Sequence, residues 1–101
     1  CDWSEALQGE PGEYIVVVRR AGDSFFLGAG TNDEPRTLTQ KLGFLKSGMT
    51  YTATIYADAP DSAENPENYR IEKRTVTSAD MLEIAMTARG GQAVTFVPVN
   101  E

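Results

Sequence analysis

The feature of this sequence that most constrains its fold is a two-residue alternation of apolar and polar side chains. In the segment from Met49 to Ala57, every second residue is apolar, and three of the four residues between them are threonines. Successive side chains of a β-strand point to opposite faces of the sheet, so this pattern predicts a strand with one buried face and one solvated face.

Similar short runs recur along the chain and are separated by turn-forming residues. We predict seven strands, at Tyr14–Arg20, Ser24–Thr31, Thr37–Leu45, Met49–Ala57, Tyr69–Thr77, Met81–Met86 and Gln92–Val99. The sequence Ala21-Gly22-Asp23 is typical of a tight hairpin turn between the first two. Pro98 cannot donate a backbone hydrogen bond, which places the last strand at a sheet edge or ends it there.

Seven short strands cannot bury their apolar faces singly. The predicted fold is therefore all-β, a two-sheet antiparallel β-sandwich of Greek-key type, with an open barrel as the alternative. The chain has 101 residues, of which 41% are hydrophobic. This size suits one core, so residues 1–101 are expected to form a single domain.

Composition argues against several classes of function. The net charge of −6 opposes binding to nucleic acids or to anionic membrane surfaces, and no apolar run is long enough for a membrane helix. Histidine is absent and Cys1 is the only cysteine, so the usual general base, an internal disulfide and soft metal ligands are all missing. We expect no nucleic-acid partner, no membrane partner and no catalytic activity in this chain.

Acidic residues gather in the segment Asp58 to Asn68, where Asp58, Asp61, Glu64 and Glu67 occur together. Paired carboxylates perform glycoside hydrolysis, and several together can bind calcium. This segment has neither apolar periodicity nor the glycine of a helix-loop-helix calcium site, so we interpret it as a solvated surface loop. We expect no catalytic, metal-binding or cofactor-binding residue.

Aromatic side chains are the remaining candidates for an exposed contact. Phe25 and Tyr51 lie on the apolar faces of their strands and are expected in the core. Trp3, Tyr14, Tyr56 and Tyr69 are the candidate contacts with a protein interface or with a sugar ring. From the residues alone, a carbohydrate-binding module that uses Tyr56, Tyr69 and the loop at 58–68 is an alternative function.

Several stretches, taken in order and spacing, resemble one known family. They are Asp2-Trp3-Ser4-Glu5, Gly12-Glu13-Tyr14, Val18-Arg19-Arg20, Gly22-Asp23, Leu27-Gly28-Ala29, Thr31-Asn32, Arg36-Thr37-Leu38, Leu42-Gly43-Phe44-Leu45, Tyr51-Thr52-Ala53-Thr54-Ile55-Tyr56, Asp58, Asn65-Pro66-Glu67, Tyr69 and Gly90-Gly91. Together they resemble the carboxy-terminal domain of glycoside hydrolase family 97, the α-glucosidase and α-galactosidase group. Ser4, Ala6, Phe25, Phe26 and Gln92 depart from the family pattern.

The resemblance implies a non-catalytic β-sandwich that follows an amino-terminal β-supersandwich and a catalytic (β/α)₈ barrel. The parent enzyme would hydrolyse α-glycosidic bonds of oligosaccharides, with its catalytic acids and its calcium in the preceding domains. The expected role of this domain is packing and oligomerisation. Its expected partners are the barrel of the same chain and a second subunit. Family analogy also implies a protein that is periplasmic or otherwise exported, with any export signal upstream of Cys1.

Overall fold

The computed structural model describes residues 3–58 and 69–99, and these residues form eight β-strands and no helix. In chain order the strands are β1 (Trp3–Glu10), β2 (Tyr14–Ala21), β3 (Ser24–Thr31), β4 (Arg36–Lys41), β5 (Thr50–Asp58), β6 (Tyr69–Thr77), β7 (Met81–Met86) and β8 (Gly91–Pro98). The all-β prediction is confirmed. Six of the seven predicted strands have their exact bounds or differ by one residue at one or both ends, because turn-forming residues mark where they begin and end.

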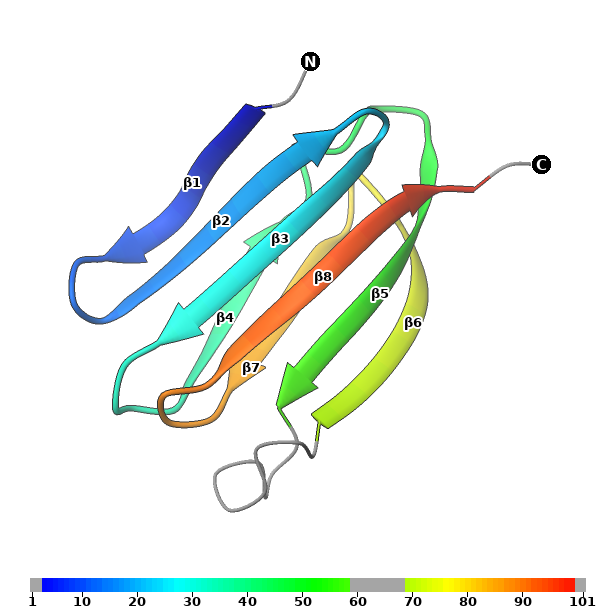
Figure 1. Ribbon diagram of the computed structural model, residues 1–101. Helices are drawn as coiled ribbons and strands as arrows, with labels where there is room; N and C mark the ends of the chain where they lie inside the picture. Colours follow the sequence, from blue (N-terminus) through cyan, green and yellow to red (C-terminus); the bar gives the residue numbers. More distant parts are fainter. Residues whose placement is uncertain (1–2, 59–68, 100–101) are drawn as a thin grey trace.

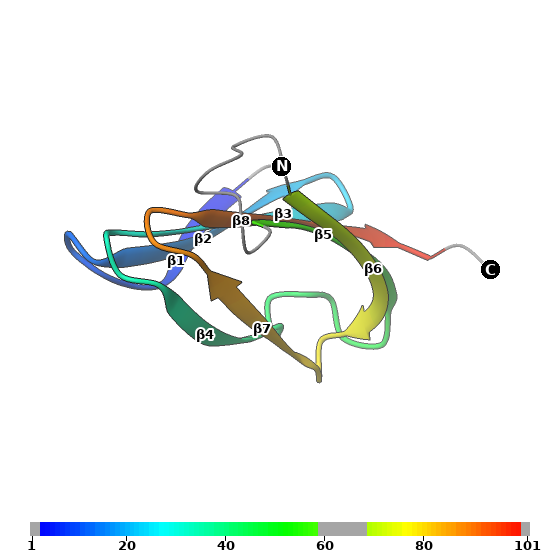
Figure 2. The ribbon, with the colours of Figure 1, turned by 90° about the horizontal axis from the view of Figure 1, so that it is seen from below.

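The strands form two antiparallel layers. The larger sheet has six strands in the order β1-β2-β3-β8-β5-β6, and the smaller sheet pairs β4 with β7. Figure 1 looks onto the larger sheet, and in Figure 2 the smaller sheet lies beneath it. The chain leaves the larger sheet after β3 and again after β6, and it returns each time. The sandwich prediction is confirmed, with very unequal sheets.

Two details of the sequence prediction are wrong, and one of the two interpretations of Pro98 is correct. Strand β1 was missed because a register shift between Ala6 and Gln8 interrupts its alternation, as a β-bulge does at a sheet edge. The strand predicted to reach Leu45 ends at Lys41, and the next residues turn, with the N–H of Leu45 donating to the carbonyl of Leu42 at 3.0 Å. Strand β8 is central rather than at an edge, and Pro98 ends it, as the second interpretation of Pro98 predicted.

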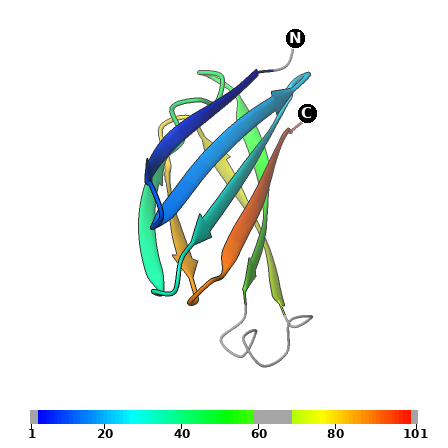
Figure 3. The same ribbon diagram turned by 60° about the vertical axis from the view of Figure 1, so that its left-hand side comes forward.

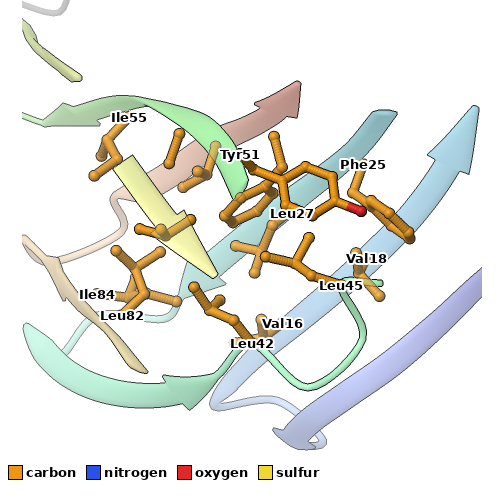
Figure 4. Packing of buried hydrophobic residues seen from close by; sticks show 14 of the residues in the cluster. Val16, Val18, Phe25, Leu27, Leu42, Leu45, Tyr51, Ile55, Leu82 and Ile84 are labelled. Carbon is orange, nitrogen blue, oxygen red and sulfur yellow. The ribbon is translucent and has the colours of Figure 1, made fainter. Parts of the chain in front are cut away.

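The core lies between the two sheets and draws on both. Val16, Val18, Leu27, Tyr51, Val94 and Phe96 come from the larger sheet, and Leu82 and Ile84 come from the smaller one. Leu42 and Leu45, in the connection after β4, are buried beside them (Figure 4). Figure 3 shows the two layers from the side of β1. Each large apolar side chain contributes about 1.5–3 kcal/mol by burial.

Aromatic rings fill one end of the core. The ring of Phe25 meets those of Phe44 and Tyr51 at centroid distances of 5.7 and 6.1 Å, and Phe44 meets Phe96 edge-on at 5.5 Å. The hydroxyl of Tyr51 accepts a hydrogen bond from the backbone N–H of Lys46 at 3.2 Å. The expectation that Phe25 and Tyr51 belong to the core is confirmed.

The alternate residues of the larger sheet point away from the core, and we call the surface they make the outer face. Its members among the described side chains are Ser4, Ala6, Ile15, Val17, Arg19, Phe26, Gly28, Gly30, Thr52, Thr54, Tyr56, Ile71, Lys73, Thr75, Ala93, Thr95 and Val97. This face is the one turned toward the reader in Figure 1.

The smaller sheet is expected to hold the sandwich closed through Ile84, which is fully buried in β7. Ile84→Ala should lower the free energy of unfolding by about 2–5 kcal/mol, because it leaves a cavity between the layers. Met81→Ala on the same strand removes an exposed side chain and should change it by less than about 0.5 kcal/mol. Urea unfolding of both variants measures the difference, and equal effects would contradict this account of the core.

Candidate interaction surface

Of the aromatic residues that the sequence analysis selected, Trp3, Tyr14 and Tyr56 lie at separate places on the described structure. Trp3 is half-buried and packs edge-on against Phe25 at a centroid distance of 6.3 Å. Tyr14 is half-buried and lies under the guanidinium group of Arg36. Tyr56 is exposed on the outer face, and Tyr69 begins β6. The side chain of Tyr69 and the acidic loop at 59–68 lie outside the described residues.

Arg36 forms a polar cluster that ties the smaller sheet to the larger one. Its guanidinium carbon lies 4.9 Å from the centroid of the Tyr14 ring. Its Nε donates to the hydroxyl of Thr31 at 3.2 Å, and its Nη2 donates to Oδ1 of Asn32 at 3.3 Å. The carboxylates of Glu13 and Glu34 lie within 4 Å. These partners provide hydrogen bonds and opposite charges for the guanidinium, so the cluster has a structural role. Tyr14 is part of it, because its ring packs against the guanidinium.

Basic residues of the larger sheet are spread over both of its faces. Arg19 and Lys73 lie on the outer face, on strands β2 and β6, and Arg19 stacks over the Phe26 ring at 5.2 Å. Arg74 points to the other side of β6 and pairs with Glu72. The hydrogen bond from Arg74 and its positive charge hold the pKa of the Glu72 carboxyl below its ordinary value.

Two grooves mark the surface at opposite ends of β2. One, of about 730 Å³, lies at the turn from β1 to β2 and is lined partly by Ala6, Ile15 and Gly30 of the outer face. The other, of about 330 Å³, lies beside the turn from β2 to β3 and includes Trp3 and Asp23. The carboxylates that line them are Glu10 and Glu13 in the first groove and Asp23 in the second.

The described part of the chain has neither a cluster of metal-ligating side chains nor a membrane-spanning helix. Across residues 3–58 and 69–99, histidine, cysteine, aspartate and glutamate side chains nowhere gather in a group of three or more that could hold a metal ion. Those same residues contain no helix of the length and hydropathy that a membrane span requires.

The outer face is the surface that the sequence analysis missed. Alternation in β5 predicted a solvated face, and the threonines there agree with it. On β2, β3 and β8, however, the outward positions include Val17, Gly28, Ala93 and Val97, which are not polar. The signal was present as apolar or glycine residues at both alternating positions of three neighbouring strands.

Comparison with known proteins gives consistent matches. Residues 1–97 match the family model described as glycosyl-hydrolase 97 C-terminal, oligomerisation. A retaining alpha-galactosidase of Bacteroides thetaiotaomicron is 30% identical over 94 residues, which is 91% of this chain and 14% of the relative. A solved glycoside hydrolase family 97 enzyme from Pseudoalteromonas sp. strain K8 is 36% identical, with a TM-score of 0.90 over 96% of this chain and 16% of that one.

The fold and the family match together define a β-sandwich that is an accessory domain of a carbohydrate-active enzyme. The chain belongs to the family of C-terminal oligomerisation domains of family 97 glycoside hydrolases. The resemblance seen in the sequence is thereby confirmed. A beta-arabinopyranosidase that is 21% identical, with a TM-score of 0.70, shares the fold. The chain spans about one sixth or less of the length of the family 97 relatives named here.

The Arg36 cluster should be sensitive to the shape of the cation as well as to its charge. Arg36→Lys keeps the charge but loses the forked donors and the stacked plane, so it should destabilise the fold by about 1–2 kcal/mol. Arg89→Lys is the matched control, because the Arg89 side chain is exposed and lies 3.8 Å from Asp33. Thermal and urea unfolding compare the two, and equal stability would exclude a structural role for the fork.

The Glu72 carboxyl should titrate below the usual range of a glutamate. Its lowered pKa means that the pair with Arg74 favours the folded state above the unfolded-state pKa and that this contribution is lost as the pH falls through the folded-state pKa. Arg74→Gln should move the pKa of Glu72 upward toward its ordinary value. Carboxyl chemical shifts followed by NMR between about pH 2 and 7 measure this, since model glutamates titrate near pH 4.3; an unchanged midpoint would contradict the pairing.

Proposed function

We propose that this chain is the domain through which a family 97 glycoside hydrolase self-associates, and that it also docks on the catalytic (β/α)₈ barrel of the same polypeptide. The observation that carries the proposal is the family match over residues 1–97, whose description is a C-terminal oligomerisation domain. The small share of each relative that the chain spans supports a parent with a much larger catalytic part.

The proposed parent reaction is hydrolysis of α-glycosidic bonds in oligosaccharides. The relative from Bacteroides thetaiotaomicron is named as a retaining alpha-galactosidase, and structures of the Pseudoalteromonas enzyme contain acarbose or panose. Those names support an α-glycoside as substrate, with glucose or galactose as the released sugar. By family resemblance, the catalytic acids would lie in the barrel. The reaction requires an acid and a base or nucleophile at a fixed separation across the bond that is cleaved.

Calcium, where the parent uses it, would be held by that catalytic region. A calcium ion needs six to eight oxygen ligands, and the described carboxylates of this chain do not gather in groups of three. We further propose that the parent is exported and acts in the periplasm. The support for export is the family resemblance, which leaves this part of the proposal to be tested by cell fractionation.

Assembly and catalysis should separate when this domain is removed. The parent enzyme is expected to lose subunits when the residues of this chain are deleted, as measured by multi-angle light scattering. The 101-residue chain alone should not hydrolyse nitrophenyl α-glucoside or α-galactoside. An unchanged assembly mass after deletion, or turnover by the chain alone, would contradict the proposal.

The carbohydrate-binding alternative makes a different prediction for the isolated chain. Titration with maltose or melibiose should leave the amide spectrum unchanged if the domain serves association. Saturable shifts clustered around Tyr56, or around the groove beside Trp3, would instead identify a sugar site. Tyr56→Ala and Trp3→Ala would then distinguish the two positions.

A further inference from the structure

The outer face carries large apolar side chains where a solvated sheet would carry polar ones. Ile15, Tyr56, Ile71 and Val97 are 50%, 40%, 54% and 48% exposed, and all four lie on this face. Met81 and Val99 are the other exposed large hydrophobic residues in the described part of the chain. Such concentration on one side of a protein marks a surface that another molecule covers.

Charged side chains, in contrast to large apolar ones, are scarce on the outer face. The chain has 15 acidic residues and a net charge of −6, yet Arg19 and Lys73 are the charged members of the outer face among the described side chains. The solvent side of the smaller sheet, by contrast, carries Lys41 and Glu83 of opposite sign. Depletion of charge distinguishes the centre of an interface from ordinary surface.

The glycines at the centre of the outer face have no explanation within the domain. A Cβ added at Gly28 or Gly30 would meet nothing within 4 Å, and neither residue has a positive φ. Gly91 is different, because its added Cβ would lie 2.8 Å from the carbonyl oxygen of Ala29. Glycine weakens a strand, and one without an internal cause marks the close approach of another surface.

The register joins these residues into one row across all six strands. In sheet order the row is Ala6, Val17, Gly28, Ala93, Tyr56 and Ile71. Its centre, at Gly28 and Ala93, is low, and Val17 and Tyr56 rise on either side of it. The groove beside Ile15 and Gly30 continues this low region toward the turn from β1 to β2.

We propose that a second copy of this chain docks face to face on the outer face, about a two-fold axis that runs parallel to the strands between β3 and β8. The proposal rests on the oligomerisation function proposed above and specifies its surface. A two-fold interface must be self-complementary. This axis places Gly28 opposite Ala93 of the other copy and Val17 opposite Tyr56, so that apolar residues meet apolar residues.

The same axis also avoids repulsion between like charges. It places Arg19 opposite Thr54 of the other copy and Lys73 opposite Ser4, because the strand order reverses across the axis. Like charges directly opposite one another would oppose association. Lys73 lies on the edge strand β6, and Arg19 lies over the Phe26 ring of the neighbouring strand.

The area is sufficient for a specific contact. Six strands spaced about 4.8 Å apart span about 24 Å, and four outward rows extend about 20 Å along the strands. Two such faces together bury on the order of 1,000 Å², the lower limit for a stable specific interface. We therefore expect a dimer of moderate affinity from this chain alone.

The test inserts one charge at the centre of the face and the same charge elsewhere. Ala93 and Ala85 are both exposed strand alanines, on the outer face and on the smaller sheet respectively. Ala93→Glu should weaken dimerisation by about 100-fold or more, because it buries a carboxylate without a partner, whereas Ala85→Glu should leave it unchanged. Sedimentation velocity across a concentration series measures both, with urea unfolding as the check on folding.

A charge swap tests the axis itself. Gly28→Lys alone should also dissociate the dimer, and an equimolar mixture with Ala93→Glu should restore association, because the two charges then face each other. Ile71→Lys, at an exposed position of β6, gives an independent disruption if either central variant fails to fold. Failure of the mixture to associate would overturn the axis.

These experiments distinguish failure of the outer-face assignment from failure of the proposed oligomerisation function. A wild-type dimer that Ala93→Glu leaves intact would overturn the outer-face assignment while oligomerisation through another surface still stands. A wild-type chain that stays monomeric in the concentration series would overturn both. If the parent enzyme carrying Ala93→Glu keeps its assembly mass but its catalytic part unfolds more easily, the occupant is the barrel, and the second-copy proposal is wrong.

Discussion

The structure depends on the burial of one face of a six-stranded sheet by a much smaller layer. Only β4 and β7 form the opposing sheet, so they cannot cover all six strands by themselves. The connection from Leu42 to Leu45 extends the cover, because both leucines are buried although neither belongs to a strand. At the edge strand β6 the cover becomes incomplete: of its inward positions Val76 is buried in the core, whereas Arg70, Glu72 and Arg74 are charged.

The same asymmetry explains where polar contacts appear. Buried polar groups in proteins are usually hydrogen-bonded. In the described structure, two polar contacts of this kind link the smaller sheet to the larger one, each near an end of the smaller sheet. Arg36 joins the start of β4 to β2 and β3, while Nε2 of Gln8 on β1 donates to Oε1 of Gln40 on β4 at 2.8 Å. Both contacts hold the smaller sheet in place where apolar packing becomes thin. Neither provides the exposed, poised side chains that chemistry would need.

The alternation of apolar and polar residues determines how much of the fold could be predicted from the sequence. It reveals which residues avoid water, so runs bounded by turn-forming residues, such as β3, β6 and β7, were predicted at the correct positions. The bulge in β1 interrupts the pattern, and the buried turn at Leu42 to Leu45 imitates a continuing strand. Pairing order is not encoded in any local pattern, which is why the central position of β8 could not be predicted. Because the pairing order was unknown, the sequence could not show that Trp3, Tyr14 and Tyr56 lie apart from one another in the fold.

Alternation also does not show what the outward-facing side chains of a strand contact. It shows only that they do not belong to the core. Gly28 and Ala93 are informative only once the register shows that they are neighbours, and once the space above Gly28 is known to be open. A domain whose role were only to fill space would gain stability from β-branched residues at these positions. The retention of small residues there is consistent with a function in association, since close approach to another surface requires them. Stability of the single copy and complementarity to a second surface therefore favour different residues at the centre of this sheet.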